Sequence, residues 1–266
     1  MLFDTHCHLD DDAFSDDVSS VVAAAKAAGV ELMLTQGTTI SSSLDSIALS
    51  ESFPGVYAAV AIHPNCLMEE IPQFSSVDAF LEIFTKMTEN PKVRAIGETG
   101  LDLYWDDTPL EIQKKFLAAH YELARRTKLP VIIHCRDAEA PLLEVTRADF
   151  EANGPVPGVI HSFSGDSEFL AACLELGFHI SYSGCVTFTN KKLDALRETV
   201  PLVPADKILV ETDSPYLAPM PYRGKVKRNS PELVVHTARF LAALRCVPEE
   251  KLCEQTTENA RKLFGI

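Results

Sequence analysis

Short apolar runs alternate with longer amphipathic stretches along the whole chain of 266 residues. The apolar runs are too short to form buried helices, and most of them lack an alternation of polar and apolar residues. This pattern is typical of parallel strands that are covered on both faces. The predicted strands are Met1–His6, Glu31–Thr35, Val56–Ile62, Val93–Gly97, Val131–His134, Gly158–His161, Phe178–Ser181 and Lys207–Val210.

The stretches between these runs show helical spacing. In the stretch from Leu110 to Arg126, for example, Ile112, Phe116 and Leu123 fall on one face and the charged residues on the other. The predicted helices include Val18–Ala28, Val77–Thr88, Leu110–Arg126 and Glu168–Leu176.

Eight strands that alternate with helices in about 260 residues predict an α/β protein, a (β/α)8 TIM barrel. We expect a single domain over residues 1–266, because no linker or repeat divides the chain. Extra C-terminal helices, Pro231–Ala243 and Pro248–Leu263, are expected to pack on the outside. A doubly wound open sheet is the alternative.

Composition limits the function and the compartment. The net charge of −14 argues against a surface that binds nucleic acid or anionic membranes generally, so a phosphate-bearing substrate needs local cationic groups or metal ions. The 7 cysteines form no CxxC pair, which favours reduced thiols in a cytoplasmic protein. The chain begins with no signal-peptide pattern and has no apolar run long enough to span a membrane. We expect a monomer.

Potential metal ligands follow or end the predicted strands. The carboxyl ends of barrel strands open onto one face, where active sites lie, so residues far apart in sequence are expected to meet there. His6 and His8 are two residues apart, a spacing that points both imidazoles to the same side of a strand. The candidate ligands are His6, His8, Glu98, His134, His161 and Asp213.

Four histidines and two carboxylates exceed what one tetrahedral zinc ion needs. They suit two divalent ions about 4 Å apart that share a bridging group. Imidazole ligands favour Zn²⁺ or Mn²⁺ over Mg²⁺. The sequence has no paired cysteines for a zinc finger, no GxSxG nucleophile motif, no Walker loop and no GxGxxG dinucleotide motif.

Other residues near the strand ends are candidates for substrate contact. If the substrate carries a phosphate, His63, which follows the third strand, is a candidate for contact with the scissile phosphate, and Arg136 for contact with a phosphate oxygen. Tyr104, with Trp105 beside it, is a candidate for stacking on a base. Arg223 and Lys225 begin a basic cluster that continues with Lys227 and Arg228. Each of these residues also has an ordinary structural interpretation, as a packed, paired or solvated side chain.

Seven short motifs, in order, resemble the TatD family of metal-dependent deoxyribonucleases. The motifs are Asp4-Thr5-His6-Cys7-His8-Leu9-Asp10, Ile62-His63-Pro64, Gly97-Glu98-Thr99-Gly100-Leu101-Asp102, Val131-Ile132-Ile133-His134-Cys135-Arg136-Asp137-Ala138, His161-Ser162-Phe163-Ser164-Gly165, Glu211-Thr212-Asp213-Ser214-Pro215 and Pro221-Tyr222-Arg223-Gly224-Lys225. Two details depart from the family pattern: the serines of the His161 motif, and extra residues between Lys225 and Asn229.

The resemblance implies two divalent ions (Mg²⁺, Mn²⁺ or Zn²⁺), with Glu98 bridging them. One ion would be held by His6, His8, Glu98 and Asp213, and the other by Glu98, His134 and His161. It also implies hydrolysis of DNA phosphodiester bonds by metal-activated water, as a 3′-to-5′ exonuclease acting on single strands or 3′ ends. Asp213, Glu98 and His63 would be the catalytic side chains, with Asp213 as a general base.

A second hypothesis is an amidohydrolase-type enzyme that cleaves a small amide, lactone or cyclic imide, because barrels with the same HxH motif hydrolyse such bonds. Relatives that cleave small esters often place a modified lysine on the fourth strand, where this chain has Glu98. Hydrolysis of DNA is therefore the favoured prediction.

Overall fold

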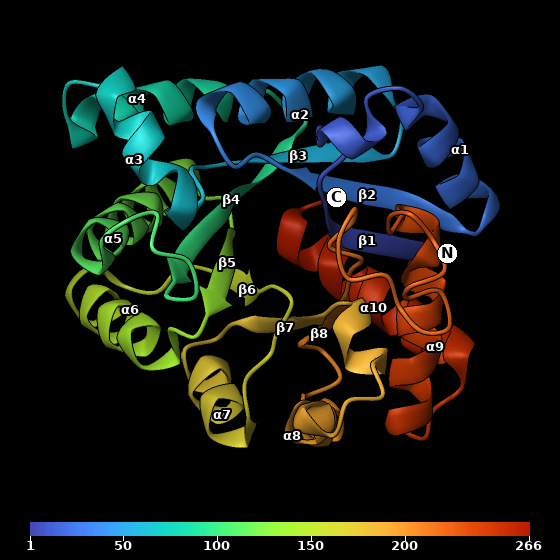
Figure 1. Ribbon diagram of the computed structural model, residues 1–266. Helices are drawn as coiled ribbons and strands as arrows, with labels where there is room; N and C mark the ends of the chain where they lie inside the picture. The colour runs from blue at the N-terminus through green and yellow to red at the C-terminus, as the bar shows by residue number, and fades with distance from the viewer.

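The computed structural model describes residues 1–266 as eight parallel strands, each paired with the next along the chain. Figure 1 shows the strands surrounded by helices, with the chain passing round the barrel from β1 to β8. The strands are β1 (Leu2–Cys7), β2 (Val30–Gln36), β3 (Val56–Val60), β4 (Val93–Asp102), β5 (Val131–Arg136), β6 (Gly158–Ile160), β7 (His179–Tyr182) and β8 (Ile208–Val210).

Ten α-helices accompany the strands, together with short 3₁₀ turns. They are α1 (Val18–Ala27), α2 (Ile40–Ser52), α3 (Leu67–Glu70), α4 (Val77–Met87), α5 (Leu110–Thr127), α6 (Glu139–Asn153), α7 (Ser167–Glu175), α8 (Asp194–Thr199), α9 (Val234–Leu244) and α10 (Glu249–Phe264). The predicted (β/α)8 TIM barrel is confirmed, and the open doubly wound sheet is not observed.

Two cores stabilise the barrel. The larger one lies between the strands and the helices and contains the phenylalanines of α4 and α5, such as Phe80, Phe84 and Phe116. The smaller one gathers residues from seven of the eight strands, which can meet only inside the barrel. Its strand residues are Phe3, Leu32, Leu34, Ala59, Ala95, Ile132, Val159 and Leu209.

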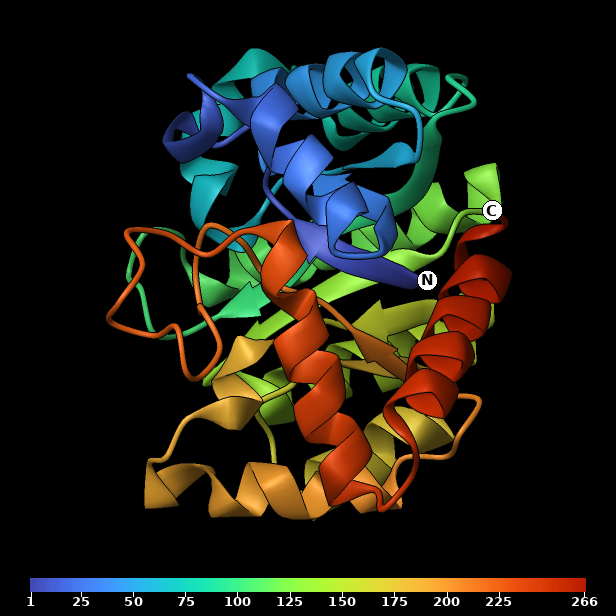
Figure 2. The ribbon, with the colours of Figure 1, turned by 90° about the vertical axis from the view of Figure 1, so that its right-hand side faces the viewer.

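The last helix closes one end of this interior. Ala260 and Phe264 of α10 join the inner core, with the rings of Phe264 and Phe3 5.9 Å apart, and the Thr257 hydroxyl donates to the carbonyl oxygen of Met1 at 3.3 Å. Figure 2 accordingly shows α10 beside the N-terminus. The sequence predicts that this helix packs on the outside; its apolar face covers the end where the strands begin and adds two residues to the inner core.

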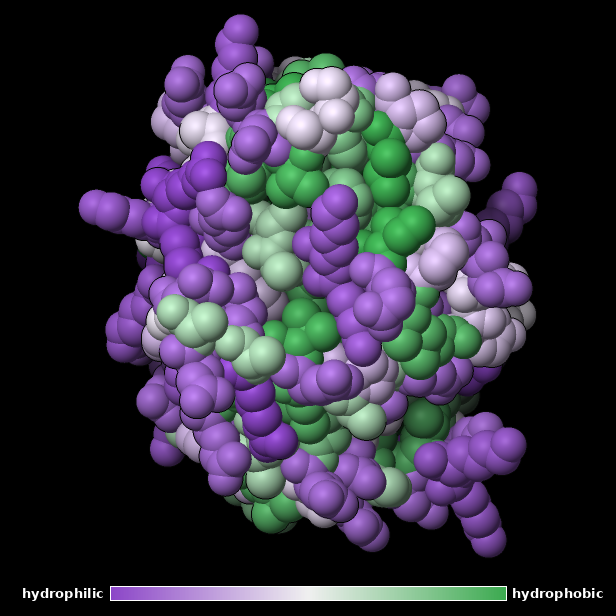
Figure 3. Space-filling view, turned by 90° about the vertical axis from the view of Figure 1, so that its left-hand side faces the viewer, coloured by the Kyte–Doolittle hydropathy of each residue, from purple (hydrophilic) through white to green (hydrophobic).

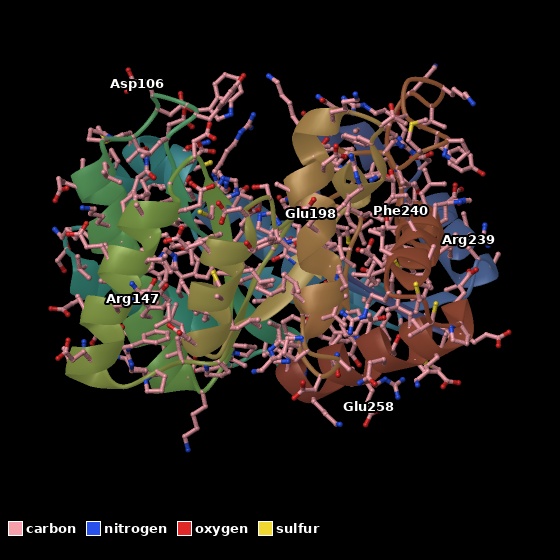
Figure 4. The ribbon with its side chains drawn as sticks, turned by 90° about the horizontal axis from the view of Figure 1, so that it is seen from below. Asp106, Arg147, Glu198, Arg239, Phe240 and Glu258 are labelled. Carbon is pink, nitrogen blue, oxygen red and sulfur yellow. The ribbon has the colours of Figure 1, made fainter.

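The opposite end of the barrel is open and carries the long loops. In Figure 4 the loop with Asp106, after β4, and the loop after β8 extend at the same end, while Glu258 of α10 lies at the other. Figure 3, which views the side of α3 to α6, shows a largely hydrophilic outer surface with hydrophobic residues in its middle. None of the helices combines the length and hydrophobicity that crossing a membrane requires.

Candidate metal centre

The six predicted ligands lie on, or just after, five of the eight strands. His6, Glu98 and His134 lie within β1, β4 and β5, whereas His8, His161 and Asp213 follow β1, β6 and β8. All of them lie in the carboxyl-terminal half of a strand or within three residues after it, on the side where a barrel places its active site. The structure brings all six together around Glu98, as the distances below show.

Closure of the barrel places the first and last strands side by side. The amide N–H of Asp213 donates to the carbonyl oxygen of His6 at 2.9 Å, and the amide N–H of His8 donates to the carbonyl oxygen of Ser214 at 2.8 Å. Cys7 and Ser214 form a parallel bridge between these bonds. The segment after β8 therefore continues the sheet for one step, and this step carries Asp213 to the side of His6 and His8.

The first group of ligand atoms contains His6, His8 and Asp213. The Nε2 atoms of His6 and His8 are 3.3 Å apart, and Asp213 Oδ1 lies 3.6 Å and 3.5 Å from them, respectively. Glu98 Oε2 faces the same space, 3.3 Å from His6 Nε2 and 3.7 Å from His8 Nε2. Two imidazole nitrogens and two carboxylate oxygens thus converge on one point.

The second group lies around the other oxygen of Glu98. Glu98 Oε1 is 2.8 Å from His134 Nδ1 and 2.7 Å from His161 Nε2, and these two nitrogens are 3.3 Å apart. Each of the two carboxylate oxygens of Glu98 therefore faces its own pair of histidines. This is the arrangement that a carboxylate bridging two cations requires.

The ring nitrogens of His134 and His161 that face away from Glu98 form hydrogen bonds, and these bonds show whether the inner nitrogens can bind a metal. His134 donates Nε2–H to Asp102 Oδ2 at 2.9 Å, and His161 donates Nδ1–H to Glu211 Oε1 at 3.3 Å. A neutral imidazole with its hydrogen on the outer nitrogen has a lone pair on the inner one. Two such lone pairs facing each other across 3.3 Å repel unless a proton or a metal ion lies between them, so the donor set fits a metal ion that takes the place of the protons.

The charges of the centre also favour cations. Burial raises the pKa of Glu98, but the charges of His161, His63 and His6 outweigh it and hold that pKa well below its usual range. Burial lowers the pKa of His8, but its hydrogen bond to Asp213 and the charge of Glu98 raise it to about 9. No Lys or Arg pairs with Glu98. The centre therefore attracts positive charge, as protons or as metal ions.

His63 has a different geometry from the other histidines. Its Nδ1 accepts the amide N–H of Asn65 at 3.2 Å, at the start of a 3₁₀ turn (Pro64–Cys66), so its hydrogen is on Nε2. Nε2 lies 3.5 Å from Glu98 Oε1. His63 is close enough to Glu98 and His134 to join a metal-ligand group, but an N–H directed into the centre makes it a hydrogen-bond donor instead.

The centre lies in a pocket of about 800 Å³. Arg136, Trp105 and Tyr216 line the pocket together with five of the six ligand residues, whereas His6 is fully buried and does not line it. The Arg136 guanidinium lies 3.7 Å from the ring centre of Tyr104 and 5.9 Å from that of Trp105. Tyr104 is 54% exposed beside the pocket, with one face covered by Arg136. The predicted contacts Arg136 and Tyr104 thus form one stack at the rim.

The basic cluster is placed differently. The Arg223 guanidinium stacks 3.6 Å from the ring centre of Phe188, and Arg228 pairs with Asp17 at 2.6 Å. Lys225 and Lys227 are exposed and form no ion pair. None of the four lines the pocket. The structure therefore does not bring Arg223 and Lys225 to the metal centre, and of the four residues only Arg228 forms an ion pair.

Two residues next to the ligands had no assigned role in the sequence analysis. Asp102 accepts from His134 and also from the amides of Tyr104 and Trp105, and Glu211 accepts from His161. Both are carboxylates at the end of, or directly after, a strand, the same signal that identified Glu98 and Asp213. Only the three-dimensional contacts separate the ligands from the side chains behind them.

The comparisons with known proteins agree with this geometry. The model of the family described as "TatD related DNase" matches residues 3–265. The chain is 36% identical over 266 residues to "Uncharacterized metal-dependent hydrolase YabD" of Bacillus subtilis, with 100% of both chains covered. It is 32% identical over 268 residues to "3′-5′ ssDNA/RNA exonuclease TatD" of Salmonella typhimurium, covering 100% of this chain and 99% of that one.

Among solved structures, the chain is similar to YjjV, a TatD homolog from Escherichia coli, with a TM-score of 0.88 and 30% sequence identity. The match covers 100% of this chain and 98% of that one. The chain is therefore a metal-dependent hydrolase and belongs to the family of TatD-related DNases.

Proposed function

We propose that the protein is a two-metal phosphodiesterase that removes nucleotides from the 3′ end of single-stranded DNA. The observation that carries this proposal is Glu98, whose two oxygens face two separate pairs of histidines at the base of an open pocket. His6, His8, Glu98 and Asp213 would hold one ion, and Glu98, His134 and His161 the other.

Two divalent ions bound together acidify a water molecule and neutralise the charge that develops on a phosphate during in-line displacement. Asp213 accepts the proton of the attacking water. Burial raises its pKa, but its hydrogen bond to His8 and the charge of His6 lower the pKa below the usual value. Asp213 is therefore ionised near neutral pH and able to act as a base.

His63 and Arg136 are assigned to the phosphate. His63 donates from Nε2 to a non-bridging oxygen, since its Nδ1 is held by Asn65. Arg136 lines the pocket and its guanidinium is fixed over Tyr104, so it offers paired N–H donors without losing much freedom on binding. The water oxygen forms a bond to phosphorus while the bond from phosphorus to the 3′ oxygen of the preceding nucleotide breaks. That oxygen takes a proton from solvent water and becomes the new 3′ hydroxyl, and a nucleoside 5′-monophosphate leaves.

A single strand is the proposed substrate because of the aromatic residues around the pocket. Trp105 and Tyr216 are 53% and 56% exposed and line it from the loops after β4 and β8. Exposed rings stack on bases that are not already stacked in a duplex. The name of the Salmonella relative, a 3′-5′ ssDNA/RNA exonuclease, supports the same substrate class.

The rest of the surface repels a polyanion, since the net charge is −14. We assign Arg223, Lys225 and Lys227 to the backbone of a longer strand, beyond the nucleotides in the pocket. The protein is proposed to act in the cytoplasm, because all seven of its cysteines are unpaired thiols.

The test uses metal-free protein with Mg²⁺, Mn²⁺ or Zn²⁺ added back, and a single-stranded oligonucleotide labelled at its 5′ end. We expect a ladder of progressively shorter labelled products and release of 5′-mononucleotides. A phosphorothioate at the last 3′ linkage should slow the reaction, and a 5′ one should not. Glu98→Ala, purified in the same way, controls for contaminating nucleases.

Small amides, lactones and cyclic imides are assayed in parallel with the same metals. Turnover of one of these with no product from DNA would overturn the proposal in favour of the small-molecule amidohydrolase. Products that lose the 5′ label first would overturn the 3′-to-5′ direction.

A further inference from the structure

Glu211 is a buried carboxylate that the proposed mechanism does not use. It follows β8 directly, is 0% exposed and has no Lys or Arg partner. Its Oε1 accepts the amide N–H of Ser162 at 2.6 Å and the Nδ1–H of His161 at 3.3 Å. Its Oε2 is buried and has no hydrogen-bond partner. A buried carboxylate oxygen without a donor is rare in folded proteins.

A matching donor lies close by. His6 Nδ1 is also buried and without a partner. The ligand atoms of His6, His161 and Glu211 all lie within 4.8 Å of one another. The imidazoles of His6 and His161 stack in parallel, with centroids 3.9 Å apart and an angle of 9° between their planes. His161 thus directs Nε2 towards Glu98 and Nδ1 towards Glu211. His6 is stacked on it with Nε2 towards Glu98, and a ligand nitrogen of His6 lies within 4.8 Å of Glu211 without a hydrogen bond between them in this structure. A hydrogen bond between His6 and Glu211 therefore requires a small shift of the two side chains.

The other nearby carboxylate is not available to His6 Nδ1. Asp4 accepts the Thr212 amide at 2.8 Å, the Thr212 hydroxyl at 2.6 Å and the backbone amide of His6 at 3.4 Å. Its oxygens are therefore committed to the backbone and hydroxyl of the β1–β8 junction. Glu211 is the carboxylate with a free oxygen on the Nδ1 side of His6.

We propose that Glu211 is a shared positioning residue, whose two oxygens hold the Nδ1–H groups of His6 and His161 at the same time. His6 belongs to the first ligand group and His161 to the second. One carboxylate thus orients a ligand of each metal, as Glu98 does from the other side of the same two rings. This inference extends the two-metal assignment of the proposed function, and it concerns the side chains rather than the substrate.

Asp102 provides the matched comparison. Among the metal ligands, Asp102 contacts only His134, accepting its Nε2–H at 2.9 Å. Loss of Asp102 therefore affects only the second group. Loss of Glu211 affects both groups. Substitution of a carboxylate behind a metal ligand typically weakens metal binding by about 10–100-fold.

Glutamine at position 211 separates the two roles. An amide has one acceptor oxygen and one donor NH₂ group. The Ser162 amide N–H, at 2.6 Å, fixes the acceptor oxygen on the His161 side. The NH₂ group then faces His6 Nδ1 and favours the tautomer with its hydrogen on Nε2, which cannot bind a metal.

The experiment counts slowly exchanging imidazole N–H protons by NMR in the Zn²⁺-saturated full chain, and measures metal binding by equilibrium dialysis against Zn²⁺ and Mn²⁺. Wild type should show hydrogen-bonded Nδ1–H signals for both His6 and His161. Glu211→Ala should lose both and bind both ions about 10–100-fold more weakly. Glu211→Gln should lose the His6 signal and keep that of His161. Asp102→Asn should lose only the His134 signal.

Glu211→Gln also decides the matter if the alanine variant does not fold. Retention of both signals in a folded Glu211 variant, or loss of the His161 signal alone, would overturn the shared role. Failure of the proposed function can be distinguished from failure of this inference. If the wild type does not hydrolyse DNA, or binds a single ion, the N–H signals can still be measured.

Discussion

The backbone amide of Asp213 donates to the carbonyl oxygen of His6 at 2.9 Å, across the seam where the barrel closes. This bond joins two ligand-bearing segments that are more than 200 residues apart in sequence. The first ligand group is therefore complete only when β1 meets the segment after β8. Folding of the barrel and assembly of the metal centre are the same event at this seam.

Asp213 is expected to contribute more to turnover than to binding. In Asp213→Asn, the amide oxygen still faces His6 and His8 but cannot accept a proton from water. At saturating metal, kcat should fall by about 10²–10⁴-fold while KM changes only a few-fold. Steady-state kinetics with a labelled oligonucleotide measures both.

The control for this variant is Asp11→Asn. Asp11 lines the same pocket but accepts the Tyr216 hydroxyl at 3.0 Å and does not face Glu98. Its kcat should stay near that of wild type. An Asp213→Asn enzyme with nearly normal kcat would remove Asp213 from the role of base.

Trp105 is expected to bind a base. Stacking on an aromatic ring is worth about 1–3 kcal/mol per base, so Trp105→Ala should weaken binding of a single-stranded oligonucleotide by roughly 5- to 150-fold. Trp105→Phe should restore much of the affinity. Binding of a fluorescent oligonucleotide in the presence of a non-catalytic metal measures the effect.

Leu202→Ala is the matched surface control, because Leu202 is 56% exposed but does not line the pocket. A chromogenic nucleotide ester with a single base tests the subsite further. Equal losses for this ester and for the long strand would contradict stacking on a neighbouring base.

The two unpaired lysines of the loop after β8 are expected to bind the phosphate backbone of the strand. Lys225→Ala combined with Lys227→Ala should reduce the slope of log affinity against log salt by roughly 0.7 for each phosphate that the variant no longer neutralises. Metal content should not change, because neither lysine lines the pocket.

Lys251 and Lys262 on α10 provide the control pair, since this helix covers the opposite end of the barrel. Their replacement by alanine should leave the slope as in wild type. If the loop variant also shows the wild-type slope, the loop is a solvated surface segment without a role in DNA binding.

His120 is expected to make folding sensitive to acid. It is fully buried on α5, donates Nδ1–H to the Phe116 carbonyl at 2.7 Å and accepts the Ile62 amide at Nε2, at 3.2 Å. Burial lowers its pKa from 6.5 to about 4. The unfolded chain therefore binds a proton at this site between pH 6.5 and 4 and the folded chain does not, so stability falls as pH falls through this range.

His120→Gln keeps a donor and an acceptor but removes this titration. Urea unfolding with chelated metal at pH 7.5 and 4.5 should show that wild type loses about 2 kcal/mol more than the variant. His236→Gln, at a partly exposed position on α9, should follow wild type closely. Parallel losses in wild type and His120→Gln would contradict the assignment.

The strands could be predicted because burial on both faces leaves a plain apolar run in the sequence. The helix α2 is harder to recognise, since Ser43, Ser46 and Ser50 occupy its buried positions and hide the helical period. β4 continues to Asp102 instead of ending at Gly97. Its polar second half is buried and hydrogen-bonded in the mouth of the barrel, which local sequence does not reveal.

The metal ligands could be predicted for a related reason: each is a polar residue that ends an apolar run of the sequence or follows it within three residues. The carboxylates that hydrogen-bond to these ligands could not be predicted. Glu211 contacts His161, and Asp102 contacts His134, only after the strands are paired. The contacts of the basic cluster could not be predicted from the sequence for the same reason. The partners of Arg223 and Arg228 are Phe188 and Asp17, which lie in other segments of the chain.

The central claim is that Glu98 joins two metal ions, and metal stoichiometry tests it most directly. Protein equilibrated with Mn²⁺ or Zn²⁺ is assayed by mass spectrometry for bound metal, beside its catalytic rate and its thermal unfolding. Glu70→Gln serves as a control, because Glu70 is buried but caps α2 by accepting the Ile40 amide at 3.0 Å. Two ions per chain are expected for wild type and for Glu70→Gln. Glu98→Ala should stay folded, retain fewer than one ion per chain and lose nearly all hydrolysis, whereas two ions and normal turnover in Glu98→Ala would contradict the account.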